Sequence, residues 1–219
     1  MSEQRQTAYL ELIQSLLNCP SGEEVGVLSA HQELIDEGLV QVMRAEAEKR
    51  AQQEPGYAGW LRNFASKVET VNYSLSRLQT KLAADTLLQQ GFQQYLHSQY
   101  PLAFQSLQEC LALYQEIGDK PGMATSWGQL GYIELNRGNS DEAEHLYRQS
   151  LAIKTELGDR SSMATSWGQL GYIELNRGNW DEAERLYRQY LEVMTELDDL
   201  SGMVTSWEVL GYIEQNRGN

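Results

Sequence analysis

The sequence contains few of the residue types that carry metal or redox chemistry. Its 219 residues include two cysteines, Cys19 and Cys110, and three histidines, His31, His97 and His145. The cysteines are far apart and form no CxxC or other ligand spacing, which argues against a disulfide framework. Each histidine is isolated from the others and from cysteine, so surface positions are favoured over catalytic or metal-ligating roles. We therefore expect no metal and no cofactor.

Basic charge and long apolar runs are also scarce. Acidic residues outnumber basic ones 31 to 17, for a formal net charge of −14. A chain without a basic footprint is a poor partner for phosphate backbones or anionic membranes, so neither nucleic acid nor a membrane is expected. No apolar run is long enough to cross a bilayer, and the N-terminal stretch MSEQRQTAYLELIQSLLN lacks the features of a signal peptide. These absences predict a soluble, cytoplasmic protein.

What the chain does contain is repetition. The stretch SWGQLGYIELNRGN at 126–139 recurs without change at 166–179, and the variant SWEVLGYIEQNRGN occupies 206–219. A fixed period of this length is typical of a solenoid, in which each unit packs only on its neighbours. A fainter copy precedes these stretches, so the array is expected to begin near residue 84. The period of 40 residues is read from the tryptophans Trp127, Trp167 and Trp207.

Each repeat has the spacing of two helices. Met123, Trp127, Leu130 and Ile133 recur at steps of three and four residues and fall on one face of a first helix, called helix A. The stretch NRGN then ends this helix, because Gly138 suits the left-handed conformation that closes a helix. A second helix, called helix B, is predicted from about residue 141 to 157, and GDRSS at 158–162 ends it. The repeating unit is thus a helical hairpin, and the fold class is all-α.

These residues resemble the tetratricopeptide repeat. The chain departs from the family's usual pattern where Glu134 and Glu174 replace a late aromatic of helix A, and where Thr155 and Thr195 replace a proline. The unit is also longer than the common 34 residues, and in this it resembles a longer tetratricopeptide subclass found in scaffold proteins and bacterial signalling arrays. The resemblance implies a right-handed α-solenoid that binds proteins. The landmarks that carry it are Trp127, Leu130, Gly131, Gly138, Ala143, Tyr147 and Leu151, and they recur 40 residues later.

The repeat divides the chain into a leader and an array. The leader, residues 1–83, has helical spacing, with Ser21 and Glu24 suggesting a capping box and a new helix starting after Pro55. It resembles the helical leaders of large cyanobacterial-type tetratricopeptide proteins, some of which end in a caspase-like peptidase domain, and we expect it to cap the array. The array is expected to comprise a degenerate repeat at 84–123, repeats at 124–163 and 164–203, and one helix A at 204–219.

Packing explains most of the landmark residues. Gly131 and Ala143 are expected where the two helices of a hairpin approach closely, and the tryptophans of the repeat are expected in the core. Trp180, where the preceding copy has Ser140, is the tryptophan expected at the surface. Cys110 aligns with Ser150 and is expected to be a small buried residue. The carboxylates of DEAE at 141–144 lie in a first helical turn, where the helix dipole accounts for them better than acid–base catalysis does.

No motif predicts an enzyme, so function is expected at the surface. The tetratricopeptide register implies that helix A residues line a concave groove for a peptide or protein partner. Gly128 and Gly168 cost roughly 1 kcal/mol each inside a helix, either to let a partner come close or to make room for neighbouring helices. The residues that the register places in this groove are Thr125, Gly128, Gln129, Tyr132, Asn136, Thr165, Gly168, Gln169, Tyr172, Asn176, Tyr212 and Asn216.

The last repeat predicts self-association. It supplies a helix A whose residues Trp207, Leu210 and Ile213 would lack a hairpin partner, so either the chain is a fragment of a longer array or another molecule covers this end. The second alternative leads to the hypothesis of a homo-oligomer through this end. The leading functional hypothesis is a non-catalytic scaffold for protein–protein interaction, which the resemblance extends to a bacterial signalling protein. Two alternatives stay open: the regulatory part of a larger enzyme, such as a caspase-like peptidase whose catalytic domain lies outside this chain, or a structural assembly unit.

Overall fold

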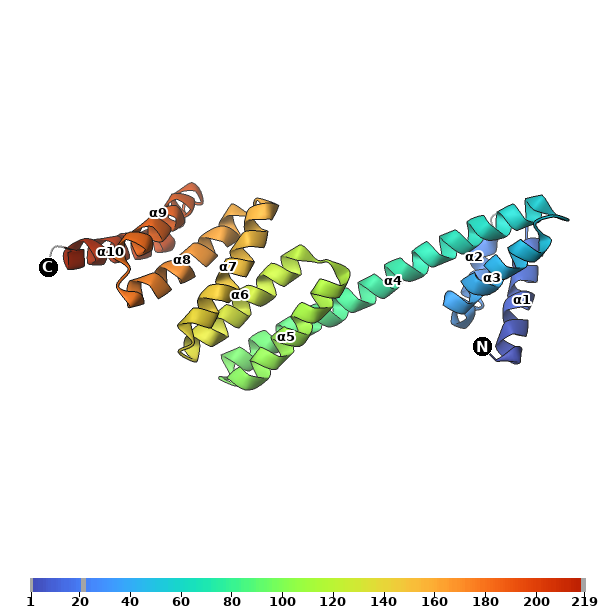
Figure 1. The fold of residues 1–219 in the computed structure, drawn as a ribbon, viewed down its shortest axis with the longest axis horizontal. Coiled ribbons are helices and arrows are strands. Elements are labelled where there is room, and N and C mark those ends of the chain that lie inside the picture. Colours follow the sequence, from blue (N-terminus) through green and yellow to red (C-terminus); the bar gives the residue numbers. More distant parts are fainter. Residues whose placement is uncertain (1, 21–22, 218–219) are drawn as a thin grey trace. The chain divides into compact units, whose positions relative to one another are not determined.

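The chain folds almost entirely into helices (Figure 1). The computed structural model describes residues 2–20 and 23–217. Within them the chain forms ten α-helices, one short 3₁₀ helix and no strand, which confirms the all-α prediction. None of these helices has both the length and the apolar composition that a bilayer crossing requires. The elements are α1 (Glu3–Asn18), α2 (Glu24–Ser29), η1 (Gln32–Leu34), α3 (Glu37–Arg50), α4 (Pro55–Leu96), α5 (Tyr100–Ile117), α6 (Lys120–Asn136), α7 (Ser140–Leu157), α8 (Arg160–Arg177), α9 (Trp180–Glu196) and α10 (Leu200–Arg217).

Two compact units make up the chain. The first is Met1–Gln79 and the second is Thr80–Asn219, whereas the sequence predicted the division between residues 83 and 84. Helix α4 contributes residues to both units, because no glycine or proline interrupts it near this division.

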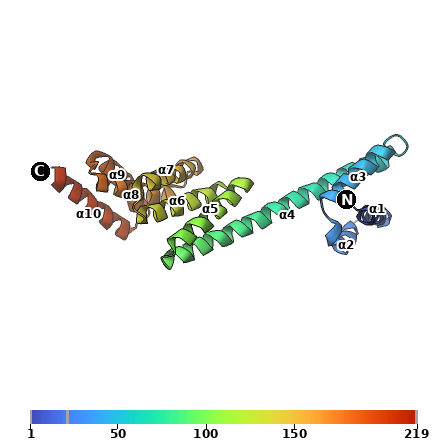
Figure 2. The ribbon, with the colours of Figure 1, turned by 60° about the horizontal axis from the view of Figure 1, so that its bottom comes forward.

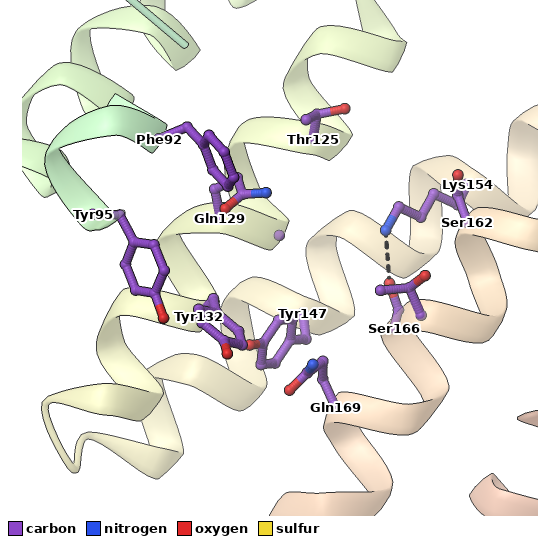
Figure 3. A pocket seen from close by; sticks show the side chains of 12 residues that line it. Phe92, Tyr95, Thr125, Gln129, Tyr132, Tyr147, Lys154, Ser162, Ser166 and Gln169 are labelled. Atoms are coloured by element: carbon purple, nitrogen blue, oxygen red, sulfur yellow. Dashed lines mark hydrogen bonds between the residues drawn. The ribbon is translucent and has the colours of Figure 1, made fainter. Parts of the chain in front are cut away.

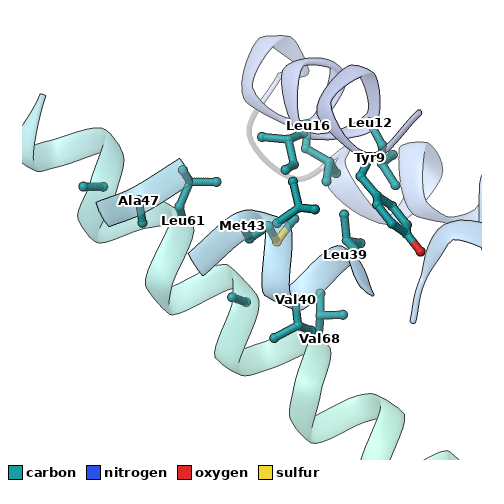
Figure 4. Packing of buried hydrophobic residues seen from close by; sticks show 13 residues of the cluster. Tyr9, Leu12, Leu16, Leu39, Val40, Met43, Ala47, Leu61 and Val68 are labelled. Carbon is teal, nitrogen blue, oxygen red and sulfur yellow. The ribbon is translucent and has the colours of Figure 1, made fainter. Parts of the chain in front are cut away.

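The first unit is a small helical bundle. Side chains from α1, α3 and α4, among them Leu12, Met43 and Leu61, meet in one buried cluster (Figure 4). Ser2 caps α1 and Asp36 caps α3, each through a side-chain oxygen that accepts a backbone N–H. The capping box proposed from the sequence involves Ser21, which lies outside the described residues.

A buried tyrosine joins α1 to the start of α3. The hydroxyl of Tyr9 donates to the carboxylate of Asp36 at 2.7 Å, and Arg5 donates to the same carboxylate at 2.6 Å. These hydrogen bonds and Arg5 keep the pKa of Asp36 below its usual value despite its partial burial. The cap of α3 therefore also fixes the position of α1 within this unit.

The second unit is a stack of helical hairpins. Helices α6 and α7 form one hairpin and α8 and α9 the next, and each helix from α5 to α10 packs on its neighbours in sequence (Figures 1 and 2). Glycines with positive φ follow α5 to α8, including Gly138 at +82° as predicted, Gly118 at +65° and Gly158 at +69°, whereas Asp198 at +53° follows α9. Only glycine adopts this conformation without steric cost, so these glycines mark the ends of helices within the repeat.

The cores of successive hairpins are built in the same register. One cluster contains Ala103, Leu107, Leu130, Ile133 and Leu146 with Trp127 packed against it. The next cluster contains the residues 40 positions later, with Trp167 in the equivalent place: Ala143, Tyr147, Leu170, Ile173 and Leu186. This correspondence is what a repeat predicts, because equivalent residues then shelter the same apolar surface.

Close approach explains the landmark glycines, as predicted. A Cβ at Gly131 would lie 3.1 Å from the ring of Tyr147 and 3.3 Å from the carbonyl oxygen of Ala143. A Cβ at Gly171 would lie 2.9 Å from the ring of Tyr187. Any larger side chain at these two positions would push the buried tyrosine out of its place.

The third tryptophan of the repeat departs from the prediction. Trp127 and Trp167 are half-buried in their clusters, but Trp207 is 53% exposed. In the first two copies a following helix, α7 or α9, packs beside the tryptophan, whereas among the described residues α10 packs mainly on α9. Trp180, expected at the surface, is half-buried, and its ring stands edge-on to Tyr212 at 6.1 Å.

Candidate protein-binding groove

Three adjoining pockets lie along α4 and α6 to α10 in the second unit, and we call them together the groove. The central pocket, of about 450 Å³, lies between α4, α6, α7 and α8 (Figure 3). The second pocket, of about 430 Å³, lies between α8, α9 and α10. The third, of about 410 Å³, lies between α6, α7 and α8. Gln169 lines all three, so the pockets are continuous at this residue.

Ten of the twelve predicted groove residues line these pockets. They come from α6 and α8, the helix A members of two hairpins, because residues four apart on a helix project from the same face. The helical period therefore repeats the same polar and aromatic side chains along the groove. The ten residues are Thr125, Gly128, Gln129, Tyr132, Asn136, Thr165, Gly168, Gln169, Tyr172 and Asn176.

The other two predicted residues line none of these pockets. Tyr212 packs edge-on against Trp180, as described above. The side-chain amide of Asn216 donates to the backbone carbonyl of Tyr212 at 2.7 Å. Asn136 makes the same bond to Tyr132, so this asparagine position serves its own helix in both copies.

One end of the central pocket is aromatic. Tyr95 and Tyr132 meet edge to face, with ring centroids 5.2 Å apart, and Phe92 lies nearby (Figure 3). Burial is the main reason that the pKa of Tyr95 is raised to about 12, and the neighbouring Tyr132 adds to this effect. Tyr147 forms part of the wall, is 3% exposed, and its hydroxyl has no hydrogen-bond partner.

The other end of the central pocket carries a lysine. The ammonium of Lys154, on α7, donates to the hydroxyl of Ser166, on α8, at 2.9 Å (Figure 3). Burial lowers the pKa of Lys154, and the charge of Asp159 opposes this shift. Among the described residues that line the central pocket, Lys154 is the only one with a charged side chain.

Comparison with known families fits this architecture. Two family models, each described as tetratricopeptide repeat, match residues 82–156 and 166–201. The chain is a tetratricopeptide-repeat protein. Such repeats generally mediate protein–protein interaction and are typically non-catalytic. No curated protein matches the chain.

A solved structure supports the fold of this tetratricopeptide protein. The crystal structure of BtubC (BKLC) from P. vanneervenii is similar with a TM-score of 0.59, over 99% of this chain and 84% of that one. The two sequences are 15% identical, so the likeness concerns the fold alone.

The tetratricopeptide groove also contains residues that sequence reasoning missed. The prediction placed only helix A residues there, whereas helix B supplies Tyr147 and Lys154 to the central pocket and Tyr190 and Met194 to the second. The replacement of Lys154 by Met194 in the next copy was visible in the sequence. This replacement shows that the surface of helix B differs between the two copies. Whether the side chain at this position reaches the groove depends on how helix B packs beside helix A.

Ion pairs between hairpins were also missed. Arg177, at the end of α8, pairs with Asp141 in the first turn of α7 and with Glu144, which directly follows that turn. The same arrangement recurs 40 residues later, where Arg217 pairs with Asp181 and Glu184. The first-turn carboxylates of helix B therefore have partners in the next hairpin, in addition to the helix dipole that the sequence suggested.

The glutamate that replaces the family's aromatic closes the hairpin turn. Glu174 is buried and accepts hydrogen bonds from Arg177 at 2.9 Å and from Asn179 at 2.6 Å. Glu134 accepts from Arg137 and Asn139 in the same way. The stretch NRGN thus supplies the donors that keep a buried carboxylate satisfied.

One of the three residues predicted for self-association is buried and cannot contact a second chain. Ile213 is fully buried inside the chain, which corrects the expectation that it lacks a packing partner. Among the described residues, α10 packs mainly on α9, and this contact accounts for the burial. Leu210 is half-buried, and Trp207 is exposed.

Proposed function

We propose that this tetratricopeptide protein is a non-catalytic scaffold that binds a peptide or protein segment in the groove. The observation that supports this most is the continuity of the three pockets at Gln169. Each pocket falls within the size range of ligand sites, and a row of them suits an extended or helical segment better than one small molecule. Hydroxyl and amide groups of the walls can bind backbone groups of the segment, while tyrosine rings contact its side chains.

The glycines of the groove favour close approach by a partner. A Cβ at Gly128 would lie 3.5 Å from the hydroxyl oxygen of Ser150, and one at Gly168 would lie 3.8 Å from the ring of Tyr190. These are ordinary van der Waals distances, so helix packing does not require glycine at either position. Of the two explanations left open by the sequence, room for a bound segment is therefore the better supported.

Alanine substitution of exposed groove residues tests the proposal. A library of displayed random dodecapeptides is first enriched on the full chain. Replacing Tyr132, Tyr172 and Asn176 together with alanine should weaken capture of the enriched peptides at least tenfold, because aromatic anchors dominate such interfaces. All three side chains are exposed, so helicity and thermal unfolding should change little.

The control is a matched alanine variant on another exposed face. Tyr73 lies on α4, is exposed and belongs to the first unit. Tyr73→Ala should retain capture. Failure to enrich any peptide, or equal capture by the wild-type chain and the triple variant, would contradict a groove function.

Self-association is a second candidate, supported by an exposed apolar set near α9 and α10. Leu197, Leu200, Val204 and Trp207 are all exposed there. The face of α10 that carries Trp207 corresponds to faces of α6 and α8 that α7 and α9 cover. The occupant we propose is the same exposed apolar face of a second copy, so that the chain forms a homo-oligomer through this end.

A further inference from the structure

Among the described residues, no carboxylate contacts the ammonium group of Lys154 in the central pocket. With the residues that the structure describes, Lys154 makes a single hydrogen bond, to Ser166, whereas an ammonium group can donate three. Its neighbours in the pocket wall are neutral tyrosine, threonine, serine and glutamine side chains. Partial burial of a charge with this little compensation destabilises it, which is why the pKa of Lys154 is lowered.

A second group of the same pocket also lacks a partner. The hydroxyl of Tyr147 is buried and makes no hydrogen bond within the described part of the chain, although buried hydroxyl groups are normally satisfied. Tyr147 and Lys154 lie seven residues apart on α7, two helical turns, and therefore on the same side of that helix. The pocket thus leaves a cation and a hydroxyl unsatisfied along one wall.

Resting on the proposed function, we propose that the central pocket recognises an aspartate or glutamate side chain of the bound segment and that Lys154 is the residue that selects it. A carboxylate would give the ammonium the counter-charge and acceptors that the wall does not supply. The tyrosine end of the pocket, with Phe92, Tyr95 and Tyr132, would hold the apolar part of the same segment.

A side chain fits this pocket better than a chain terminus. The central pocket shares Thr165 and Gln169 with the second pocket, and Tyr132 and Gln169 with the third. The groove therefore continues from the central pocket into both neighbouring pockets, and a bound segment passes through it. The carboxylate that meets Lys154 then belongs to an internal residue.

The repeat provides its own comparison. Met194 occupies the position of Lys154 in the next copy, and it lines the second pocket together with Tyr187 and Tyr190. The helical hairpin accommodates an uncharged side chain of similar length there. Lys154→Met is therefore expected to remove the charge while preserving the fold.

The test uses peptides enriched on the full chain from a displayed dodecapeptide library. Each enriched acidic peptide is compared with its Asp→Asn or Glu→Gln version, and with an amidated C-terminus. We expect the acid-to-amide change to weaken binding to the wild-type chain about tenfold, and amidation to have no effect. Lys154→Met should bind the acidic peptide about tenfold more weakly than wild type and should no longer distinguish acid from amide.

Lys120→Met is the matched control. Lys120 lies outside the groove, is exposed, and pairs with Glu156, so this variant changes the net charge equally. It should behave as wild type. An acid preference that persists in Lys154→Met overturns the inference, as does binding that depends on the free C-terminus. Thermal unfolding of both variants shows that the fold is retained.

A second measurement separates this inference from the groove function. N-acetylglutamate N-methylamide and the corresponding glutamine derivative are titrated into lysine-¹³Cε-labelled protein. The glutamate derivative should shift the Lys154 resonance, and the glutamine derivative should not. If the glutamate and glutamine derivatives shift the Lys154 resonance equally, the proposed lysine site is wrong, even if peptides bind in the groove. Failure to enrich any peptide overturns the groove function, and these two capped residues then decide the lysine site by themselves.

Discussion

At the scale of the residue, two glycines on α8 meet different surroundings. A Cβ at Gly168 faces the groove and would touch Tyr190 at an ordinary distance of 3.8 Å. A Cβ at Gly171 faces the hairpin partner and would lie 2.9 Å from Tyr187, which is buried. Packing thus requires glycine at position 171 but not at position 168. The sequence of the two identical stretches does not distinguish these glycines, because both recur unchanged in them.

This contrast predicts opposite effects on stability. Gly168→Ala should raise the free energy of unfolding by about 1 kcal/mol, because alanine has the higher helix propensity, and thus raise Tm by about 2–4 °C. Gly171→Ala should lower Tm, since overpacking costs about 1–3 kcal/mol. Thermal unfolding followed by circular dichroism measures both. A loss of stability in Gly168→Ala would show that packing, and not a bound segment, accounts for this glycine.

At the scale of the element, Arg177 ties the end of α8 to the start of α7. Its hydrogen bond to Glu144 is the largest cause that lowers the pKa of Glu144 below its usual 4.5, and Arg148 contributes as well. A carboxyl group with a lower pKa in the folded chain stabilises the fold when it is ionised. This contribution is complete above the unfolded pKa and is lost as the pH falls through the folded value.

Acid should therefore weaken the contact between the two hairpins. We expect the free energy of unfolding to fall between about pH 7 and pH 3, and Glu144→Gln to remove about 0.5 kcal/mol of this dependence, as for a partly exposed ion pair. Urea unfolding at the two pH values measures it. Glu142→Gln, exposed on the same turn, is the control. An unchanged pH dependence in Glu144→Gln would show that this ion pair does not couple the hairpins.

At the scale of the whole molecule, each hairpin depends on its neighbours. The repeating clusters join residues of three successive helices, such as Leu107, Leu130 and Leu146. A helix face without a neighbouring helix leaves apolar side chains in water, and within the described part of the chain the surface around Trp207 and Leu200 is exposed in this way. A net charge of −14 opposes association of identical chains, so any oligomer must owe its stability to this apolar contact.

Self-association should accordingly respond to charge at this face. We expect light scattering to show an oligomer at micromolar concentration, and Trp207→Glu to convert it to a monomer. Leu157, the exposed counterpart of Leu197 one repeat earlier, serves as control, and Leu157→Glu should leave the oligomer intact. A monomeric wild-type chain at this concentration would rule out the proposal.

Much of this fold was predictable because its contacts are local. Gly131 and Tyr147 pack against each other within one hairpin, so their spacing in the chain reports their packing. The same holds for Gly138, whose left-handed conformation depends on its own backbone. The candidate groove was only half predictable: helical periodicity indicated Tyr132 and Gln169, whereas Tyr95 and Lys154 come from other helices and show no pattern that links them.

The sequence by itself determined the helical hairpin, its period of 40 residues and the residues that helix A presents on one face. It did so because apolar spacing and glycine positions act over three to seven residues. Only the tertiary structure decided that a lysine and a tyrosine of helix B complete the central pocket, that Arg177 joins two hairpins, and that Ile213 is buried while Trp207 is exposed. These features depend on which helices pack side by side, and residue spacing along one helix does not record that.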